Sequence, residues 1–277
     1  MFLLMTAGAT IILAGDYADL KFIGFSANGK YMAFEESGQW DGSGGDYATT
    51  YYIDVVNNKY AIAPSVFEWS MDSMKESLRR PLLIRYQRSV AAGLKRLNII
   101  RGNTGSQVVA HLLTDWSFAE KIETETYFYT SDGKEIHKKV PNYAGAFLVQ
   151  GDSTEKVVFN PWLYPNNFNT DEYYELTLKK TLSNAGPCEK NDDAYRIELT
   201  LQDKSHHRDL EVQVLQKDSS VPKARNCPYG YHIEQVYFYK DKLAVFLNMF
   251  SQGFEGPDMR YMAVTGELDY QSNPPGE

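Results

Sequence analysis

Short runs of apolar or alternating residues, separated by turn residues, make up most of the chain. Leu20–Phe25 is an apolar run followed by an Asn-Gly dipeptide, which is typical of tight hairpin turns, and Tyr31–Glu35 is the returning run. The clearest hairpin joins Tyr195–Gln202 to Asp209–Leu215, in which apolar and polar residues alternate. This pattern predicts antiparallel strands that bury one face and expose the other to water.

Other segments of the chain have the same character, and they extend the expected β structure from one end to the other. Further strands are predicted at Thr49–Val55, Tyr60–Ala63, Val108–Leu113, Thr124–Tyr129, Ala146–Gln150, Lys156–Phe159, Tyr173–Lys179, Tyr231–Tyr239, Lys242–Asn248 and Met259–Val264. The fold class expected from these strands is therefore mainly β, built from antiparallel meander sheets.

The periodicity changes between residues 69 and 101, where a helical insertion is expected. Apolar side chains recur there every three or four positions, at Met71, Met74, Leu78, Leu82, Tyr86, Val90, Leu94 and Leu97. We expect Ser70 to cap this helix, Pro81 to kink or split it, and Gly102 to end it.

The helical segment is also basic. Between Ser70 and Arg101 lie eight basic and two acidic residues, a local charge of +6 in a chain of net charge −8. One interpretation is a docking face for an anionic partner such as an acidic glycan, a lipid headgroup or a protein. The other is a solvated helix face that complements the acidic β body.

Two parts of the chain echo each other. FSANGKYMAF (residues 25–34) is a hairpin with an apolar return strand, and FYKDKLAVF (residues 238–246) has the same pattern. A glycine-rich loop with acidic residues follows each, GQWDGSGGD in the first case and SQGFEGPD in the second. Such repeats indicate repeated sheet units, and the first also resembles blade strands of TolB-like propellers. A propeller-like fold, a β-sandwich and an irregular barrel all fit this pattern.

The same segments carry a family resemblance. LAGDYADLKFIGFSANGKYMAFEESGQWDGSGG near the start, and NCPYGYHIEQVYFY and VFLNMFSQGFEGPDMRYMAV near the end, resemble a bacterial family of predicted secreted proteins, domain of unknown function 2259. The resemblance implies export from the cell. It brings no activity and no catalytic residue with it.

Composition narrows the class of protein further. Tyr and Phe number 20 and 14, and aromatic residues reach 14%, which favours β structure. The net charge of −8 and the sequence pI of about 5.2 argue against a nucleic-acid partner, which would require a basic surface for phosphates.

The first fourteen residues, 1–14, differ from the rest because they are apolar and uncharged. The segment is too short for a transmembrane span but suits the core of a signal peptide. It has no basic residue, so the alternatives are a true start further upstream or an ordinary buried strand. We expect one mainly β domain over 15–268, a frayed tail over 269–277, no transmembrane span in the mature chain, and a periplasmic or secreted location.

The two cysteines, Cys188 and Cys227, lack the spacing of a zinc or redox motif. In an exported protein they are the natural disulfide pair, worth roughly 3–4 kcal/mol in the chain-entropy model. In a cytosolic protein they would be two free buried thiols.

The glycine-rich loops hold the candidate binding residues. Asp41 and Asp46 could bind calcium through a flexible oxygen-rich loop, although the spacing is not that of an EF-hand. Glu255 and Asp258 occupy the matching loop. If the two echoes pack together, the four carboxylates could converge as a metal site or an acid–base pair. Alternatively, these loops are plain hairpin connections whose carboxylates bind local amides.

Loop aromatics form a second candidate set. Trp40, Trp162 and Tyr164 lie in or beside loops rich in amides and glycine, a composition suited to stacking on sugars. The alternative is a small satellite core. His111, His137 and His232 are isolated in the sequence and are expected to be structural.

No P-loop, G-x-S-x-G or H-E-x-x-H motif occurs, so no catalytic residue is assigned and no cofactor other than calcium is considered. The leading hypothesis is therefore a non-catalytic binding or interaction module, with a cell-envelope glycan or protein as its partner. The alternative is a hydrolase or metal-dependent enzyme that uses the loop carboxylates.

Overall fold

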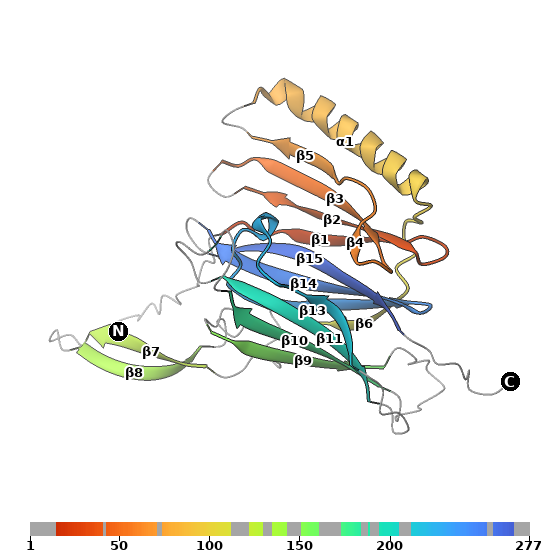
Figure 1. Ribbon diagram of the computed structural model, residues 1–277. Helices are drawn as coiled ribbons and strands as arrows, with labels where there is room; N and C mark the ends of the chain where they lie inside the picture. Colours follow the sequence, from red (N-terminus) through yellow and green to blue (C-terminus); the bar gives the residue numbers. More distant parts are fainter. Residues whose placement is uncertain are drawn as a thin grey trace, which may run out of the picture.

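Antiparallel strands stacked in layers, with a long helix on the outside, form the body of the protein (Figure 1). The structure is a computed structural model. It describes residues 15–40, 43–70, 74–111, 122–129, 135–142, 151–160, 173–183, 188, 194–204, 212–253 and 257–268, with only the backbone of 122–129 and 135–142.

The first sheet is an N-terminal meander. Its strands are β1 (Asp19–Phe25), β2 (Tyr31–Gln39), β3 (Asp46–Asp54), β4 (Lys59–Tyr60) and β5 (Ser65–Trp69). They lie in the order β1-β2-β3, and β4 and β5 both pair with β3. The expected Asn-Gly hairpin turn between β1 and β2 is confirmed: Gly29 has a φ of 73°, and the Ser26 hydroxyl donates to the Asn28 side chain.

The central sheet contains the C-terminal meander. Its strands are β6 (Ser106–Ala110), β13 (Gly230–Tyr239), β14 (Lys242–Gln252) and β15 (Pro257–Glu267), in the order β15-β14-β13-β6. Layers cover both faces of β14, so Leu243, Val245 and Leu247 pack on one side while Ala244 and Phe246 pack on the other. Burial on two faces explains why this strand has an unbroken apolar run instead of an alternating one.

The third sheet consists of β9 (Ser153–Phe159), β10 (Tyr174–Leu182), β11 (Tyr195–Asp203) and β12 (Gln213–Lys217), in the order β12-β11-β10-β9. It confirms the predicted pairing of the strands on either side of residues 204–212. A separate hairpin joins β7 (Ile122–Tyr129) to β8 (Glu135–Asn142), and a short 3-10 turn, η3 (Lys223–Arg225), precedes β13.

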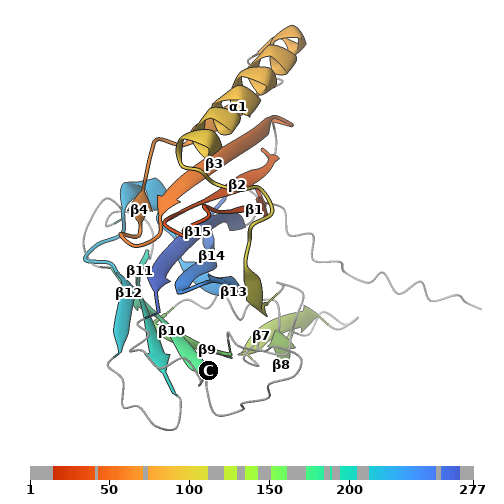
Figure 2. The ribbon, with the colours of Figure 1, turned by 90° about the vertical axis from the view of Figure 1, so that its right-hand side faces the viewer.

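The sheets and the helix lie in layers (Figure 2), and three apolar cores separate these layers. One lies between the third sheet and the central sheet, one between the central sheet and the first sheet, and one between the first sheet and the helix. The mainly β class with a helical insertion is therefore confirmed. The described strands form stacked open sheets, and they close neither a barrel nor a propeller.

The predicted echo corresponds to two similar three-stranded meanders, β1–β3 and β13–β15. They face each other across the second core, which contains Phe34 of the first and Phe246 of the second. Their hairpin turns also touch, since Lys240 Nζ and the Tyr239 hydroxyl both donate to the Ala27 carbonyl, at 2.8 and 3.1 Å. The repeated sequence pattern thus produces two packed sheets.

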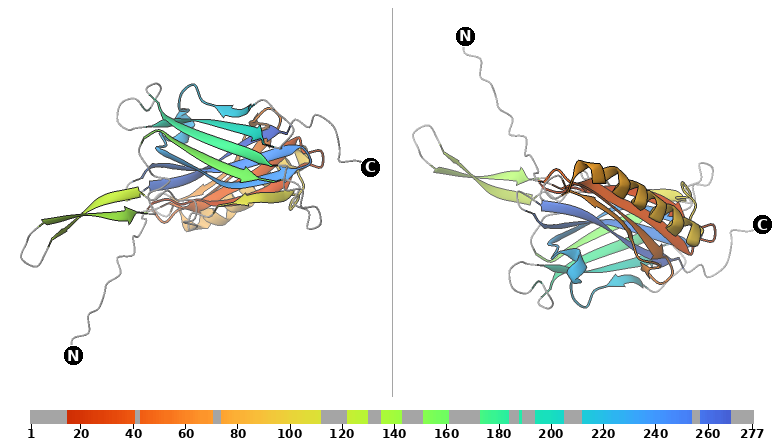
Figure 3. Two further views of the ribbon diagram at one scale, coloured as in Figure 1. Left: turned by 90° about the horizontal axis from the view of Figure 1, so that it is seen from below. Right: turned by 90° about the horizontal axis from the view of Figure 1, so that it is seen from above.

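Helix α1 (Glu76–Arg96) covers the outer face of the first sheet (Figure 3, right). Three expectations about its ends and shape were wrong. Its N-cap position is Lys75 and not Ser70, and it continues through Pro81. Pro81 lies in the exposed second turn, where water can reach the one carbonyl that the missing N–H leaves without its helical donor. The helix ends before Asn98, which adopts the left-handed conformation (φ 54°), rather than at Gly102.

The strand expected at Tyr60–Ala63 is shorter, because β4 ends at Tyr60. The helical insertion expected from residue 69 begins later, and Trp69 instead ends strand β5. The expected strand Ala146–Gln150, the signal-peptide-like segment 1–14 and the tail 269–277 lie outside the described residues.

The disulfide between Cys188 and Cys227 is confirmed, with a Cα–Cα distance of 5.6 Å. It packs in a small cluster with Ala194 and Val221. The bridge ties the chain just before β11 to the chain just before β13, and so links the third sheet to the central one.

Candidate interaction surface

One face of α1 is fixed to the first sheet. This face buries Tyr86, Val90, Gly93 and Leu94. A Cβ atom at Gly93 would lie 2.5 Å from the Tyr52 ring, so only glycine permits this approach of helix and sheet. The Tyr86 hydroxyl donates to Glu35 Oε2 at 2.6 Å, and burial raises the pKa of that hydroxyl.

The opposite face of α1 is exposed and basic. Ile84, Arg88, Ala91 and Lys95 follow one another along it at helical spacing, and all four are exposed. The helix contains one acidic residue, Glu76, and six exposed basic ones: Arg79, Arg80, Arg85, Arg88, Lys95 and Arg96. Its formal charge is therefore +5 in a chain of net charge −8.

Within the part of the chain that the structure describes, the first of these cations is the one that pairs with the β body. Arg79 pairs with Asp46 at the start of β3, and its guanidinium lies 5.1 Å from the centre of the Trp69 ring. Among the described residues, no carboxylate lies within ion-pair distance of the other five basic side chains. Among the described residues, the predicted complementarity between helix and acidic body is thus seen at Arg79.

Exposed apolar side chains accompany the charges. Met74 precedes the helix, and Leu78, Leu83 and Ile84 belong to its N-terminal half, with exposed fractions between 38% and 48%. The sequence pattern placed Met74 and Leu78 on the buried face, but the helix begins to bury its inner face fully only at Tyr86. The N-terminal half of α1 therefore presents arginine and aliphatic side chains together.

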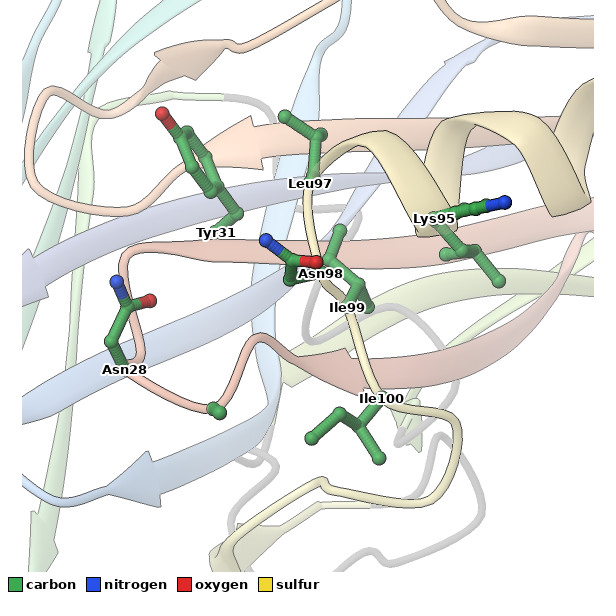
Figure 4. Close-up of a pocket in the computed structure, with 9 residues that line it drawn as sticks. Asn28, Tyr31, Lys95, Leu97, Asn98, Ile99 and Ile100 are labelled. Carbon is green, nitrogen blue, oxygen red and sulfur yellow. The ribbon is translucent and has the colours of Figure 1, made fainter.

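A shallow pocket of about 650 Å³ lies at the other end of the helix (Figure 4). Asn28 and Tyr31 line one side, and Leu97, Ile99 and Ile100 of the chain that leaves α1 line the other. Lys95 contributes the cationic group at this site. The pocket thus continues the mixed basic and apolar character of the helix.

The structure places three of the predicted loop residues. Trp40 and Asp46 lie on either side of the β2–β3 loop, and Asp258 lies at the start of β15. Asp46 accepts a hydrogen bond from Gln39 in addition to its pairing with Arg79, and Asp258 accepts one from the Asp16 amide at 3.0 Å. Both described carboxylates therefore have local partners.

Arg260 of β15 packs against the β2–β3 hairpin. Its guanidinium lies 5.0 Å from the Trp40 ring and 4.6 Å from the Tyr47 ring, and Nε lies 3.7 Å from Glu36 Oε1. Burial raises the pKa of the Glu36 carboxyl, while a hydrogen bond from the Tyr261 amide and the charge of Arg260 act against this rise. The two echoes do pack together here, through an arginine that the sequence analysis did not select.

Asp41, Glu255, Trp162 and Tyr164 lie outside the described residues. Calcium binding by the loop carboxylates, sugar stacking and the enzyme alternative therefore remain predictions.

The structure brings together one set of side chains that could hold a metal ion and that the sequence pattern does not indicate. His111 and His232, expected to be isolated, lie beside Glu155. Among the described residues this is the only such group of three. No sequence spacing signals it, because the three residues come from three different strands or strand ends.

The layered β body, the disulfide and the peripheral basic helix define a mainly β protein whose features fit an exported one. None of the described helices has the length and apolar character needed to cross a membrane. The chain belongs to the family described as predicted secreted protein (DUF2259), whose model matches residues 33–267. This match confirms the family resemblance of the two ends. No curated protein and no solved structure matches the chain.

Proposed function

We propose that the protein is an exported, non-catalytic interaction module that docks the outer face of α1 onto an anionic lipid surface. The observation that carries the proposal is the row of exposed cations without ion-pair partners among the described residues, from Arg80 to Arg96. In a chain of net charge −8, a helix of charge +5 concentrates the positive potential on one side.

Electrostatics favours an oriented encounter. Each Lys or Arg near an anionic membrane surface contributes about 1 kcal/mol, and five such side chains on one helix supply a substantial attraction. The inner face of α1 is packed on the first sheet, so the helix is held in place before it meets a partner. Docking would then require no folding of the helix.

The exposed aliphatic side chains favour lipid over a purely charged partner. Leu78 and Ile84 lie among the arginines, and the apolar pocket at Leu97–Ile100 adds to them. Helices that bind membrane interfaces combine basic residues with apolar side chains that enter the boundary between headgroups and acyl chains. An acidic glycan would use the charges but leave the aliphatic groups exposed to water.

A charge-neutralising variant tests this function. Replacing Arg80, Arg85 and Arg88 with glutamine should weaken binding to anionic phospholipid vesicles about 100-fold, since three contributions of about 1 kcal/mol are lost. Arg79 is left unchanged because it pairs with Asp46. Binding is measured by vesicle co-sedimentation at low salt, and circular dichroism checks that the fold is intact.

The matched control removes the same charge elsewhere. Lys21, Lys59 and Lys223 are exposed and lie outside α1, so their triple glutamine variant should bind vesicles nearly as well as the parent chain. Equal losses in both variants would mean that net charge alone matters. Absence of vesicle binding by the parent chain, with retention on an acidic polysaccharide, would replace lipid by glycan as the partner.

A further inference from the structure

Three side chains meet at the edge of the central sheet where β6 ends. His111 directly follows β6, His232 lies on β13, and Glu155 reaches across from β9 of the third sheet. The pairing of β6 with β13 stops at Ala110 and Gln235, although the His111 amide still donates to the Glu234 carbonyl at 2.7 Å. Two sheets and a strand end therefore converge on this point.

The three groups are close enough to share one ion. A ligand atom from each of the three lies within 4.8 Å of the other two. His232 Nδ1 lies 3.0 Å from Glu155 Oε1, and the rings of His111 and His232 are stacked with centroids 6.0 Å apart. His232 is 1% exposed, so its position is fixed by the surrounding core.

The two oxygens of Glu155 have different surroundings. Oε2 accepts a hydrogen bond from the Ile233 amide at 3.2 Å, which fixes the carboxylate against β13. Oε1 is buried and accepts no hydrogen bond within the described part of the chain, and the imidazole of His232 is its close neighbour. A buried carboxylate oxygen without a donor is costly unless a cation is near it.

A second acid nearby is already engaged. Glu234 is buried, and its carboxylate accepts hydrogen bonds from Asn248 at 2.6 Å and from Gln235 at 3.0 Å. It therefore does not compete for the same ion, which leaves Glu155 as the carboxylate of the group.

We propose that His111, Glu155 and His232 bind a divalent transition-metal ion of the zinc type. Two imidazoles and one carboxylate form a nitrogen and oxygen ligand set that suits zinc and its first-row neighbours, whereas calcium requires more oxygen ligands. Three protein ligands leave one position of a tetrahedral ion for water or another ligand.

The geometry requires only a small adjustment. Bonds of about 2.0–2.2 Å to a tetrahedral ion place ligand atoms about 3.4 Å apart. The ligand atoms here lie within 4.8 Å of one another, at most about 1.4 Å further apart than that, and His111 lies at the end of the β6 ladder, where its amide donates to the Glu234 carbonyl. A bound ion would join the third sheet to the central sheet, so binding should also stabilise the fold.

Zinc titration of the full chain tests the site. The protein is first treated with EDTA and dialysed, and ZnCl₂ binding is then followed by calorimetry and by the midpoint of thermal unfolding. We expect one zinc ion per chain and a rise of several degrees in the midpoint, with no comparable rise in CaCl₂. Cobalt(II) should give the visible absorption of a tetrahedral site.

Conservative variants separate this site from other histidines. Glu155→Gln and His111→Gln, at two partly exposed positions, should each weaken zinc binding at least tenfold and remove the cobalt absorption, while the midpoint of the metal-free protein stays nearly unchanged. The chain also has two adjacent histidines, His206 and His207, and the variant with both replaced by glutamine is the control that should bind zinc like the parent. No zinc binding, or loss of binding only in the control variant, would overturn the proposal.

Discussion

Replacing Cys188 and Cys227 with serine is expected to lower the free energy of unfolding by about 4 kcal/mol. The bridge closes a loop between residues 39 apart, and the loss of chain entropy in the unfolded state gives this magnitude. It also joins the segments that precede β11 and β13, so its removal loosens the link between two sheets. The total free energy of unfolding of a domain is roughly 5–15 kcal/mol, so the loss of the disulfide would remove a large part of it.

Urea unfolding with and without reductant measures the effect. The serine variant should unfold at the same urea concentration in both conditions, and the parent chain should approach it only when reduced. A parent chain that does not respond to reductant, or a variant as stable as the oxidised parent, would contradict a stabilising disulfide.

Replacing Phe246 with alanine is expected to lower the free energy of unfolding by about 3–5 kcal/mol. Phe246 is fully buried on β14, and its ring contacts those of Phe22, Phe34 and Tyr237, at centroid distances between 5.2 and 5.9 Å. It lies between the two meanders, so truncation opens a cavity in the core that holds both echoes together.

The control for this variant is Val158→Ala on β9. Val158 is 56% exposed, and its truncation should change the stability by less than about 0.5 kcal/mol. If the two substitutions lowered the free energy of unfolding equally, the core between the first sheet and the central sheet would not stabilise the fold as the structure indicates.

The strands were predictable because their chemistry is local. The hairpins at β1–β2 and β11–β12 follow from alternation and turn residues, and the apolar run of β14 follows from burial on both faces. The echo of the two meanders was also visible in the sequence, although the stacking that resulted from it was not. Layer order depends on contacts between residues far apart in the chain.

The helix shows the limits of local rules. Its apolar spacing predicted the inner face correctly from Tyr86 to Leu97, but Leu78 is exposed because the N-terminal half of α1 is not packed fully on the sheet. The spacing alone cannot show where the neighbouring sheet ends. Whether an arginine of α1 has an ion-pair partner also depends on where the sheet ends, so the sequence spacing does not show it.

The group at His111, Glu155 and His232 lay beyond sequence reasoning for a related reason. Each residue is unremarkable in its own strand, and the three meet only because β9 packs across β13 at the point where β6 ends. The cysteine pair, in contrast, was predictable once export was assumed, since no other cysteine competes.

Protection of individual arginines on vesicles is the most direct test of the docking role of α1. The protein is treated with an arginine-specific dicarbonyl reagent, with and without anionic vesicles, and modification is quantified by mass spectrometry. Arg80, Arg85 and Arg88 should be protected by the vesicles, while Arg196, exposed on β11 of the third sheet, should react equally in both samples. Equal reactivity of the helix arginines with and without vesicles, or equal protection of Arg196, would contradict docking through this helix.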